Sequence, residues 1–446
     1  MNRRAVDVQI VSRPARLDRG RRSTAPRRVL ARLGGLKCTA LMLRGGGGTP
    51  TRFLIETVGC DLALPPLLAL NAVRGANGEI RVGPLIGVLT AGHLAPNRPT
   101  ARALFGHQSY LLRNLARTAC QLRGFLFAFE PAGIDWASGR INGWTWAKDR
   151  WREIRAPLPD VVYNRVPNRR LEAESAVQQA IVGLRNRGVP VFNPFFIDKW
   201  RLYECLQADE SVAWYLPQTE PLTGWQVVAD ALAHSPLVYL KPRCGSLGDG
   251  IVRLEAVGRD TLRVRYRRGR SNRSRLLTAS SGPQFVAGLI ARRDYVCQRG
   301  VELPLFRGRP FDVRVLAQKD GVGQWQLTGM GVRVAGAGAI TTHVPSGGSI
   351  APLEPVLSEI FGERADRVKA DLRAAIAALA PAVERGLNAE FGELSMDLGV
   401  DRTGRVWFFE ANSKPHKFDE DDIRLLSWRR TIEYAGYLGG FPHLGG

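Results

Sequence analysis

Two strand-like segments near the C-terminal end of the chain constrain its fold most strongly. The segments LSMDLGV (394–400) and RVWFFEAN (405–412) are separated by only four residues, DRTG. Two apolar strand-like runs around such a short turn predict an antiparallel hairpin. Regular pairing across this turn sets residue 397 opposite residue 408.

Three polar side chains are expected on one face of this hairpin, because side chains alternate between faces along a strand. They are Asp397, Glu410 and Asn412. Two carboxylates and an amide among aromatic residues are costly to bury unless something binds them. Oxygen ligands of this kind suit Mg²⁺, which takes one or two carboxylates together with substrate phosphates. We therefore predict a metal site here. The alternative is an acidic face exposed to solvent, and the apolar residues VWFF that flank Glu410 make such exposure less favourable.

A glycine-rich loop follows a strand that carries one of the few lysines of the chain. In LVYLKPRCGSLGDGIVRLE (237–255), the strand ends near Lys241, and Gly245, Gly248 and Gly250 follow it. Glycines let backbone N–H groups approach a phosphate, and the lysine adds a positive charge. The lysine precedes the glycines and a strand follows them, so this is not a Walker A loop. A phosphate-binding loop and a tight hairpin turn fit the segment equally well.

A second predicted hairpin carries an arginine suited to phosphate chemistry. FDVRVLAQ (311–318) and WQLTGMGVRV (325–334) form this hairpin, and Asp312 and Arg314 share one of its faces. An arginine in such a position can steady a transferred phosphoryl group. The sequence leaves open the alternative that Arg314 belongs to an ordinary exposed ion pair.

The charge of the chain is large but local. The 446 residues carry a net charge of +22, of which residues 1–44 contribute +10 and residues 259–275 contribute +7. The remaining 385 residues carry only +5. Neither basic segment has regularly interleaved aromatic residues or a known nucleic-acid-binding module, which argues against a nucleic-acid partner.

Other classes of protein are also disfavoured. No stretch approaches about 18 uninterrupted apolar residues, so we expect no membrane partner. The six cysteines show no CxxC pair and no cluster, which fits neither a disulfide framework nor a zinc site and suits the reducing cytoplasm.

Length and composition predict a globular chain of two or three domains, because 45% of its residues are hydrophobic. Residues 1–50 are expected to form a basic, flexible arm and linker. Residues 51–160 show a strand, helix, strand order that predicts a small α/β domain. Residues 161–435 are expected to form a second, α+β domain, followed by a tail at 436–446.

Taken together, the motifs resemble the ATP-grasp superfamily. They are Lys199, Lys241 with its glycine loop, YVCQRGVEL (295–303), DVRV (312–315), MDLGV (396–400) and FFEANSKP (408–415). The segments PLPDVVYNRVPNR (157–169) and FNPFFIDKW (192–200) resemble the endospore coat-associated YheC/YheD-like branch, and the resemblance covers about residues 80–435. It implies an ATP-grasp fold, in which two α+β subdomains grip ATP, with a lid at about 199–295 and a small α/β domain before it.

The resemblance also implies roles for individual residues. Lys199 and Lys241 would contact ATP, and Arg314 would lie near the γ-phosphate, with Lys241 and Arg314 assisting the chemistry. The residue that holds the ribose is not assigned, because Glu302 comes early in the motif. The other implied contacts are Gly245, Ser246, Gly248 and Gly250 for a loop over the phosphates, Gln298, Arg299 and Val301 along the adenine, and Asp397, Glu410 and Asn412 for Mg²⁺.

The implied activity is that of a Mg-ATP-dependent ligase. It would activate an unidentified carboxylate as an acylphosphate, which an amine or a thiol then attacks. Arg333, Lys414 and the NRVPNRR turn (164–170) are candidate anchors for an anionic substrate. The alternative is a nucleotide-binding structural component of the spore coat with little or no ligase activity. We expect the protein in the cytoplasm, with the spore coat as a candidate site of association.

Overall fold

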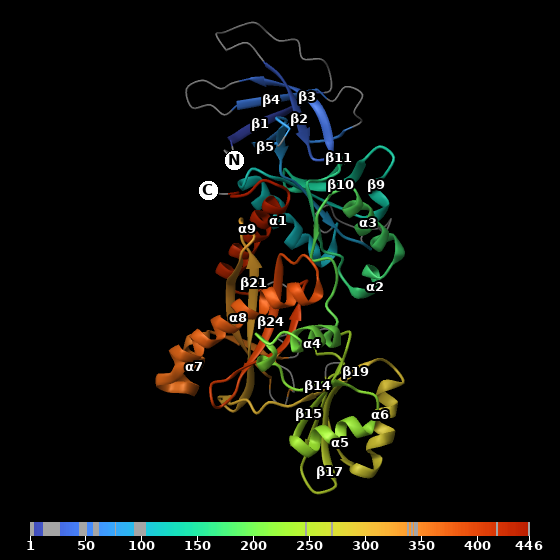
Figure 1. Cartoon of the computed structure of the whole chain (residues 1–446), viewed down its shortest axis with the longest axis vertical. Helices are drawn as coiled ribbons and strands as arrows, with labels where there is room; N and C mark the ends of the chain where they lie inside the picture. The colour runs from blue at the N-terminus through green and yellow to red at the C-terminus, as the bar shows by residue number, and fades with distance from the viewer. Residues whose placement is uncertain are drawn as a thin grey trace.

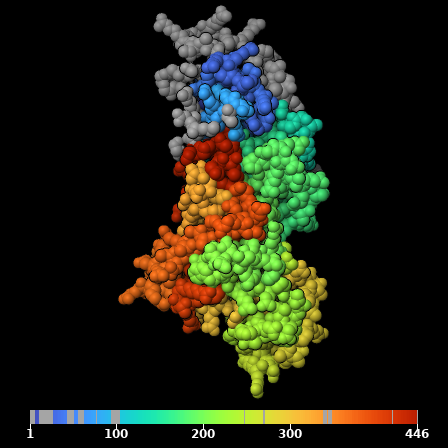
Figure 2. All heavy atoms as spheres, viewed as in Figure 1, coloured from blue at the N-terminus to red at the C-terminus, as the bar shows by residue number. Residues whose placement is uncertain are grey.

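Four β-sheet units follow one another along the long axis of the molecule (Figures 1 and 2). The computed structural model describes residues 4–11, 27–43, 51–56, 62–75, 77–92, 104–245, 248–268, 271–336, 339, 342, 347–415 and 418–444. Among these residues, no helix has the length and apolar character needed to cross a membrane. The chain runs from a barrel at one end, through a second sheet and out to a lid at the other end, and returns through a central sheet.

The N-terminal unit is a closed six-stranded barrel, with strand order β1-β4-β3-β2-β6-β5. The expectation of a flexible arm over residues 1–50 is therefore wrong for β1, β2 and β3. Val6 and Val8 of β1 are buried inside the barrel, whereas Arg27 and Arg28 of β2 are exposed. The many arginines of this segment concealed the alternation of buried and exposed residues. The glycine-rich run at 44–50 lies outside the described residues. The strands are β1 (Arg4–Val11), β2 (Arg27–Leu33), β3 (Leu36–Leu43), β4 (Thr51–Glu56), β5 (Leu67–Arg74) and β6 (Ile80–Gly83).

The second unit is a seven-stranded sheet with order β11-β10-β8-β7-β12-β13, to which β9 is added beside β10. Its first part, β7 (Leu85–Leu89), α1 (Ser109–Gln121) and β8 (Phe125–Phe129), has the predicted strand, helix, strand order. The predicted boundary at residue 160 is wrong, because β12 and β13 pair in parallel beside β7 and extend this sheet to residue 192. The other elements are β9 (Ile134–Asp135), β10 (Arg140–Ala147), β11 (Arg150–Pro157), β12 (Val161–Asn164), α2 (Arg169–Glu172), α3 (Ser175–Asn186) and β13 (Val191–Phe192).

The third unit is the lid, a six-stranded sheet with order β14-β19-β15-β16-β17-β18. Apolar side chains of one face, including Val238, Leu240 and Val264, pack with helices α5 and α6. The lid begins later than predicted, because α4 (Lys199–Gln207) packs on α8 of the central unit. The elements are β14 (Thr219–Pro221), α5 (Trp225–His234), β15 (Leu237–Pro242), β16 (Val252–Ala256), β17 (Thr261–Arg268), β18 (Ser271–Thr278), α6 (Gly282–Ile290) and β19 (Tyr295–Arg299).

The fourth unit is the central sheet, with order β23-β22-β21-β24-β25 and β20 beside β21. Helices α7 and α8 cover one face, where Val313 and Val315 of β21 are buried. Leu316, which follows Val315 and lies on the opposite face of the strand, packs instead with Phe418 and Ile423 on the side of α9. The elements are β20 (Leu305–Phe306), β21 (Arg309–Lys319), β22 (Trp325–Val334), β23 (Ser349–Ala351), α7 (Leu353–Phe361), α8 (Ala365–Leu387), β24 (Glu393–Val400), β25 (Val406–Asn412) and α9 (Asp421–Leu438).

The last residues of the chain are packed, which corrects the predicted tail at 436–446. Phe441 and Leu444 are 0% and 2% exposed and belong to a core formed by α1, α9 and the second sheet. Arg81 of the barrel donates a 2.6 Å hydrogen bond to the carbonyl oxygen of Gly439. The C-terminal segment therefore joins the central unit to both N-terminal units.

We predict that Leu444→Ala lowers the free energy of unfolding by about 2–5 kcal/mol, because it leaves a cavity in a closed core. Leu425→Ala is the matched control: Leu425 lies on α9 and is 60% exposed, so its loss is expected to change stability by less than about 0.5 kcal/mol. Urea denaturation of both variants checks this, and equal, small effects would contradict a packed C-terminus.

Candidate active site

A β-bulge in the β24–β25 hairpin brings the two predicted carboxylates together. Asp397 pairs with Glu410, whereas the next residue of β24, Leu398, pairs with Phe408. Phe409 is therefore the extra residue of β25. The predicted pairing of 397 with 408 is wrong, but the expected shared face of Asp397 and Glu410 is confirmed, because directly paired residues lie on one face of a sheet. Asn412 donates a 3.2 Å hydrogen bond to Glu410.

Two arginines hold the carboxylate of Asp397. Arg314 donates to Asp397 Oδ1 at 3.0 Å and to the hydroxyl of Ser395 at 3.2 Å. Arg333 lies 2.8 Å from Asp397 Oδ2 and also donates two hydrogen bonds to Asp312. Burial lowers the pKa of Arg333, but attraction by Asp397 and Asp312 outweighs it, so that pKa is raised. The site therefore holds permanent charges in fixed positions.

Lys199 connects helix α4 to the central sheet. The side chain of Asp198 caps this helix by accepting 2.9 Å hydrogen bonds from the N–H groups of Trp200 and Arg201. Lys199 is consequently the first helical residue. Its ammonium lies 3.0 Å from Glu410 Oε2 and donates to the carbonyl oxygen of Gly245 at 3.2 Å.

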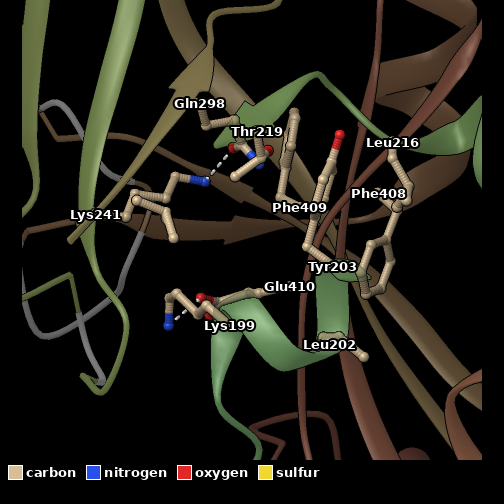
Figure 3. A pocket seen from close by; sticks show the side chains of 11 residues that line it. Lys199, Leu202, Tyr203, Leu216, Thr219, Lys241, Gln298, Phe408, Phe409 and Glu410 are labelled. Atoms are coloured by element: carbon tan, nitrogen blue, oxygen red, sulfur yellow. Dashed lines mark hydrogen bonds and ion pairs between the residues drawn. The ribbon is translucent and has the colours of Figure 1, made fainter. Parts of the chain in front are cut away.

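Lys241 reaches the same pocket from the lid (Figure 3). The burial of β15 alternates strictly, so Lys241 lies on the sheet face opposite the one that packs with α5 and α6. Its ammonium donates to Gln298 Oε1 at 2.6 Å and lies 5.5 Å from the centre of the Phe409 ring. Burial lowers the pKa of Lys241 to about 8, an effect that attraction by Glu410 opposes and repulsion by Lys199 reinforces.

A narrow pocket of about 20 Å³ lies between these lysines and the central sheet. Gln298 and Thr219 are joined at its lid side by a 3.0 Å hydrogen bond. The pocket has room for a water molecule but not for a purine, so the binding of a base requires side chains to move. Sequence reasoning missed Leu202 and Tyr203, which line the pocket three and four residues after Lys199 on α4; that helical spacing could have found them.

The predicted phosphate loop is only partly described. Gly248 and Gly250 have φ angles of +72° and +74°. The φ angle of Gly250 lies in the left-handed region, which favours glycine at this position, and a Cβ atom there would meet the mobile end of the Arg293 side chain at 2.0 Å. Ser246 lies outside the described residues.

The predicted adenine strand contributes one side chain to the pocket. Arg299, the last residue of β19, bonds to Gln218 and to the carbonyl oxygen of His234. Val301 follows the end of that strand and does not line the pocket, so only Gln298 of the three expected residues does.

The donor set fits Mg²⁺ in its chemistry. Within the described parts of the chain, no three His, Cys, Asp or Glu side chains are grouped as a metal site. The paired carboxylates of Asp397 and Glu410, with the amide of Asn412 beside them, provide the one or two carboxylates that Mg²⁺ takes when phosphates supply further oxygens.

A larger cleft of about 850 Å³ opens from this centre. Arg314, Glu410 and Asn412 line one part of it, and its lining also includes residues of α1 and α9. Lys414, a predicted anchor, lines the cleft and is ion-paired with Glu172. Burial lowers the pKa of Lys414 to about 8, and attraction by Glu172 opposes the shift.

Comparison with known proteins identifies the family. A model of the YheC/D-like ATP-grasp domain matches residues 188–438, more than half of the chain. The chain belongs to the YheC/D-like ATP-grasp family. Its fold is therefore that of an ATP-grasp protein, a fold that implies the binding of ATP.

Two curated relatives share this assignment. The chain is 32% identical to endospore coat-associated protein YheD of Bacillus subtilis (strain 168) over 374 residues, which cover 80% of each chain. It is 22% identical to endospore coat-associated protein YheC of the same strain, over 69% of this chain and 85% of the relative.

Solved structures with similar folds include ligases. D-cycloserine synthetase DcsG matches with a TM-score of 0.46 at 15% identity, over 79% of this chain and 99% of that one. D-alanyl-alanine synthetase A of Vibrio cholerae matches with a TM-score of 0.44 at 11% identity, over 80% and 98%.

We predict that the affinity for ATP falls as the pH rises above about 8. Lys241 carries a positive charge below its pKa of about 8 and loses this charge above it, so ATP binding must then take up a proton. The dissociation constant should increase by at most about tenfold per pH unit, as measured by calorimetry between pH 7 and 9.5. Lys241→Arg, whose guanidinium stays charged, should flatten this rise, and an equally steep rise in that variant would contradict the assignment.

Proposed function

We propose that the protein is a Mg-ATP-dependent ligase that joins a carboxylate to an amine or a thiol through an acylphosphate. One observation carries the proposal: two lysines and the carboxylate of Glu410 line a single pocket, and Glu410 is paired with the carboxylate residue Asp397. Lys199 lies 3.0 Å from Glu410, and Lys241 lies above Phe409, the residue between the two pairings of the bulge. The membership in the ATP-grasp family is consistent with this proposal.

The chain's own residues would position the phosphates. Lys199 and Lys241 would exchange their present partners, Glu410 and Gln298, for phosphate oxygens of ATP. The glycine loop would close over these phosphates, because its positive φ angles expose backbone N–H groups. Phosphoryl transfer depends mainly on such positioning and on charge neutralisation.

Asp397, Glu410 and Asn412 would hold Mg²⁺, which when bound would supply positive charge to neutralise the phosphate oxygens. Arg314, fixed by Asp397 and Ser395, would donate to the oxygens on which charge develops. Arg333 would act as a positioning residue, because its guanidinium is bound by two carboxylates.

The reaction would then proceed in two balanced steps. The substrate carboxylate attacks the γ-phosphorus, and ADP leaves. The amine attacks the carbonyl carbon of the acylphosphate, and the amine proton and inorganic phosphate leave. The cleft of about 850 Å³, which is continuous with Arg314 and Glu410, would hold the substrates.

The second candidate is a nucleotide-binding structural protein of the spore coat. It is favoured by the names of the relatives, both of which are called endospore coat-associated. The pairing of Arg314 and the buried Arg333 with the buried carboxylate of Asp397 argues against it, because a structural role does not require charges to be held at such a desolvation cost. We propose an association with the spore coat only as the setting of the enzyme.

The two candidates differ in the release of phosphate. With Mg-ATP and pooled carboxylates and amines, a ligase releases phosphate only when an acceptor is present, whereas a structural protein binds ATP without release. Glu410→Gln should lower the acceptor-dependent rate by about 10²-fold or more, because a carboxylate ligand of Mg²⁺ is lost.

Glu363→Gln is the matched control, since Glu363 is exposed and lines neither the pocket nor the cleft. It should retain the rate of the parent protein. Equal phosphate release by the parent and by Glu410→Gln would contradict the proposed role of this carboxylate.

A further inference from the structure

The large cleft has a second cationic centre away from the nucleotide pocket. Arg165 lines the cleft and is 9% exposed. Its Nη1 lies 3.5 Å from Glu393, and its Nη2 donates to the carbonyl oxygen of Pro415 at 3.3 Å. Its Nε has no hydrogen-bond partner within the described residues. A buried guanidinium donor without a partner is costly, and a ligand carboxylate would satisfy it.

The charged side chains around Arg165 include more cations than carboxylates. Lys414 and Arg169 also line the cleft, and Glu172 binds Lys414. The carboxylate of Glu172 also accepts hydrogen bonds from Asn164 and from the N–H of Phe196. Glu393 is likewise held, by Tyr163 and by Gln318 at 3.2 Å. Three cations therefore face two carboxylates that are already bound within the protein.

The central sheet fixes the distance between this centre and the reactive one. Glu393 and Asp397 belong to the same strand, and their neighbours on β21 are Gln318 and Arg314. Four residues of extended strand separate them, which is about 13 Å. Arg165 lies beside the first carboxylate and Arg314 beside the second. A single amino acid cannot bridge this gap, whereas an extended peptide of about four residues can.

The cleft also has apolar side chains in its lining, beside charged and polar ones. Leu111 and Leu115 come from α1, Trp428 comes from α9, and Leu316 and Phe418 complete this surface. Tyr110, which is 42% exposed, meets Trp428 edge to face with ring centres 5.9 Å apart. The volume of about 850 Å³ lies near the upper end of the range of about 300–1,000 Å³ for ligand sites. Apolar side chains of a peptide would find matching surface here.

We propose that the acceptor is a short extended peptide, whose C-terminal carboxylate binds Arg165 and whose N-terminal amine reaches the acylphosphate near Arg314. This inference rests on the proposed ligase function. The amine attacks the acyl carbon, so an amide bond forms at the N-terminus of the peptide while inorganic phosphate leaves. Arg165 is a binding residue in this scheme, since it would touch the end of the acceptor that does not react.

Direct binding tests the inference without requiring turnover. The full-length protein, with Mg²⁺ and a non-hydrolysable ATP analogue, is titrated by calorimetry with the tetrapeptide Ala-Leu-Phe-Ala and with its C-terminal amide. The free acid should bind about 10- to 100-fold more tightly, because a charge-assisted hydrogen bond is lost in the amide. An N-acetylated peptide with a free carboxylate should still bind but should not be ligated. Equal affinity for acid and amide in the parent protein would overturn the inference.

Variants then locate the carboxylate. Arg165→Gln should abolish the preference for the free acid, and Arg165→Lys should restore part of it. Arg117→Gln is the control, because Arg117 is an exposed residue of α1 that is ion-paired with Asp149 at 2.8 Å; it should keep the full preference. Binding of the ATP analogue confirms that each variant is folded. An unchanged preference in a folded Arg165→Gln protein would also overturn the inference.

The outcomes separate this inference from the proposed function. Carboxylate-dependent peptide binding without phosphate release in any acceptor mixture would contradict the ligase and leave a peptide-binding cleft. Phosphate release with single amino acids or other amines, but not with tetrapeptides, would support the ligase and overturn the peptide acceptor.

Discussion

The bulge at Phe409 sets the geometry on which the rest of the site depends. If the pairing of Leu398 with Phe408 continued regularly, Phe409 would lie opposite Asp397, and an aromatic ring would occupy the position that a carboxylate now holds. Phe409 is instead the additional residue, so Glu410 lies opposite Asp397, while Phe408 remains in the core with Leu398. The ring of Phe409 also lies beneath the ammonium of Lys241. One inserted residue thus creates the paired carboxylates and part of the surface that meets the lid.

The charges of the site are already paired within the protein. Lys199 holds Glu410, and Arg314 and Arg333 hold Asp397. When a nucleotide binds, these side chains would therefore exchange a carboxylate partner for a phosphate. Most of the cost of desolvating the charged side chains of the protein has already been met on folding. Lys241 is the exception, because burial lowers its pKa to about 8. Its charge near neutral pH is the least secure of the set, so it is the group through which pH would act.

The sequence was sufficient for the two hairpins of the central sheet and for the lid strand that carries Lys241, because their apolar runs are regular and the turns of the hairpins are short. It identified Asp397 and Glu410 as neighbours although the predicted register was wrong, because a shift of two residues keeps the same face. It failed for the barrel, where arginine content concealed the alternation of Val6 and Val8. The bulge itself leaves no mark in the alternation of residues 405–412, and so it was not predicted.

The substrate cleft could be predicted least, because its walls come from distant parts of the chain. Tyr110 and Trp428 meet across more than three hundred residues of sequence. The turn at 164–170 was a candidate anchor on its basic residues alone, but only the fold shows that Arg165 is buried within it and faces Glu393. Non-local packing of this kind has no short-range signal in a single sequence.

A crystal structure with Mg²⁺ and a non-hydrolysable ATP analogue tests the central claim most directly. The account predicts the β- and γ-phosphates between Lys199 and Lys241 on one side and Arg314 on the other, with metal density on Asp397 and Glu410. Nucleotide bound elsewhere, or phosphates in this pocket with no metal at either carboxylate, would contradict it.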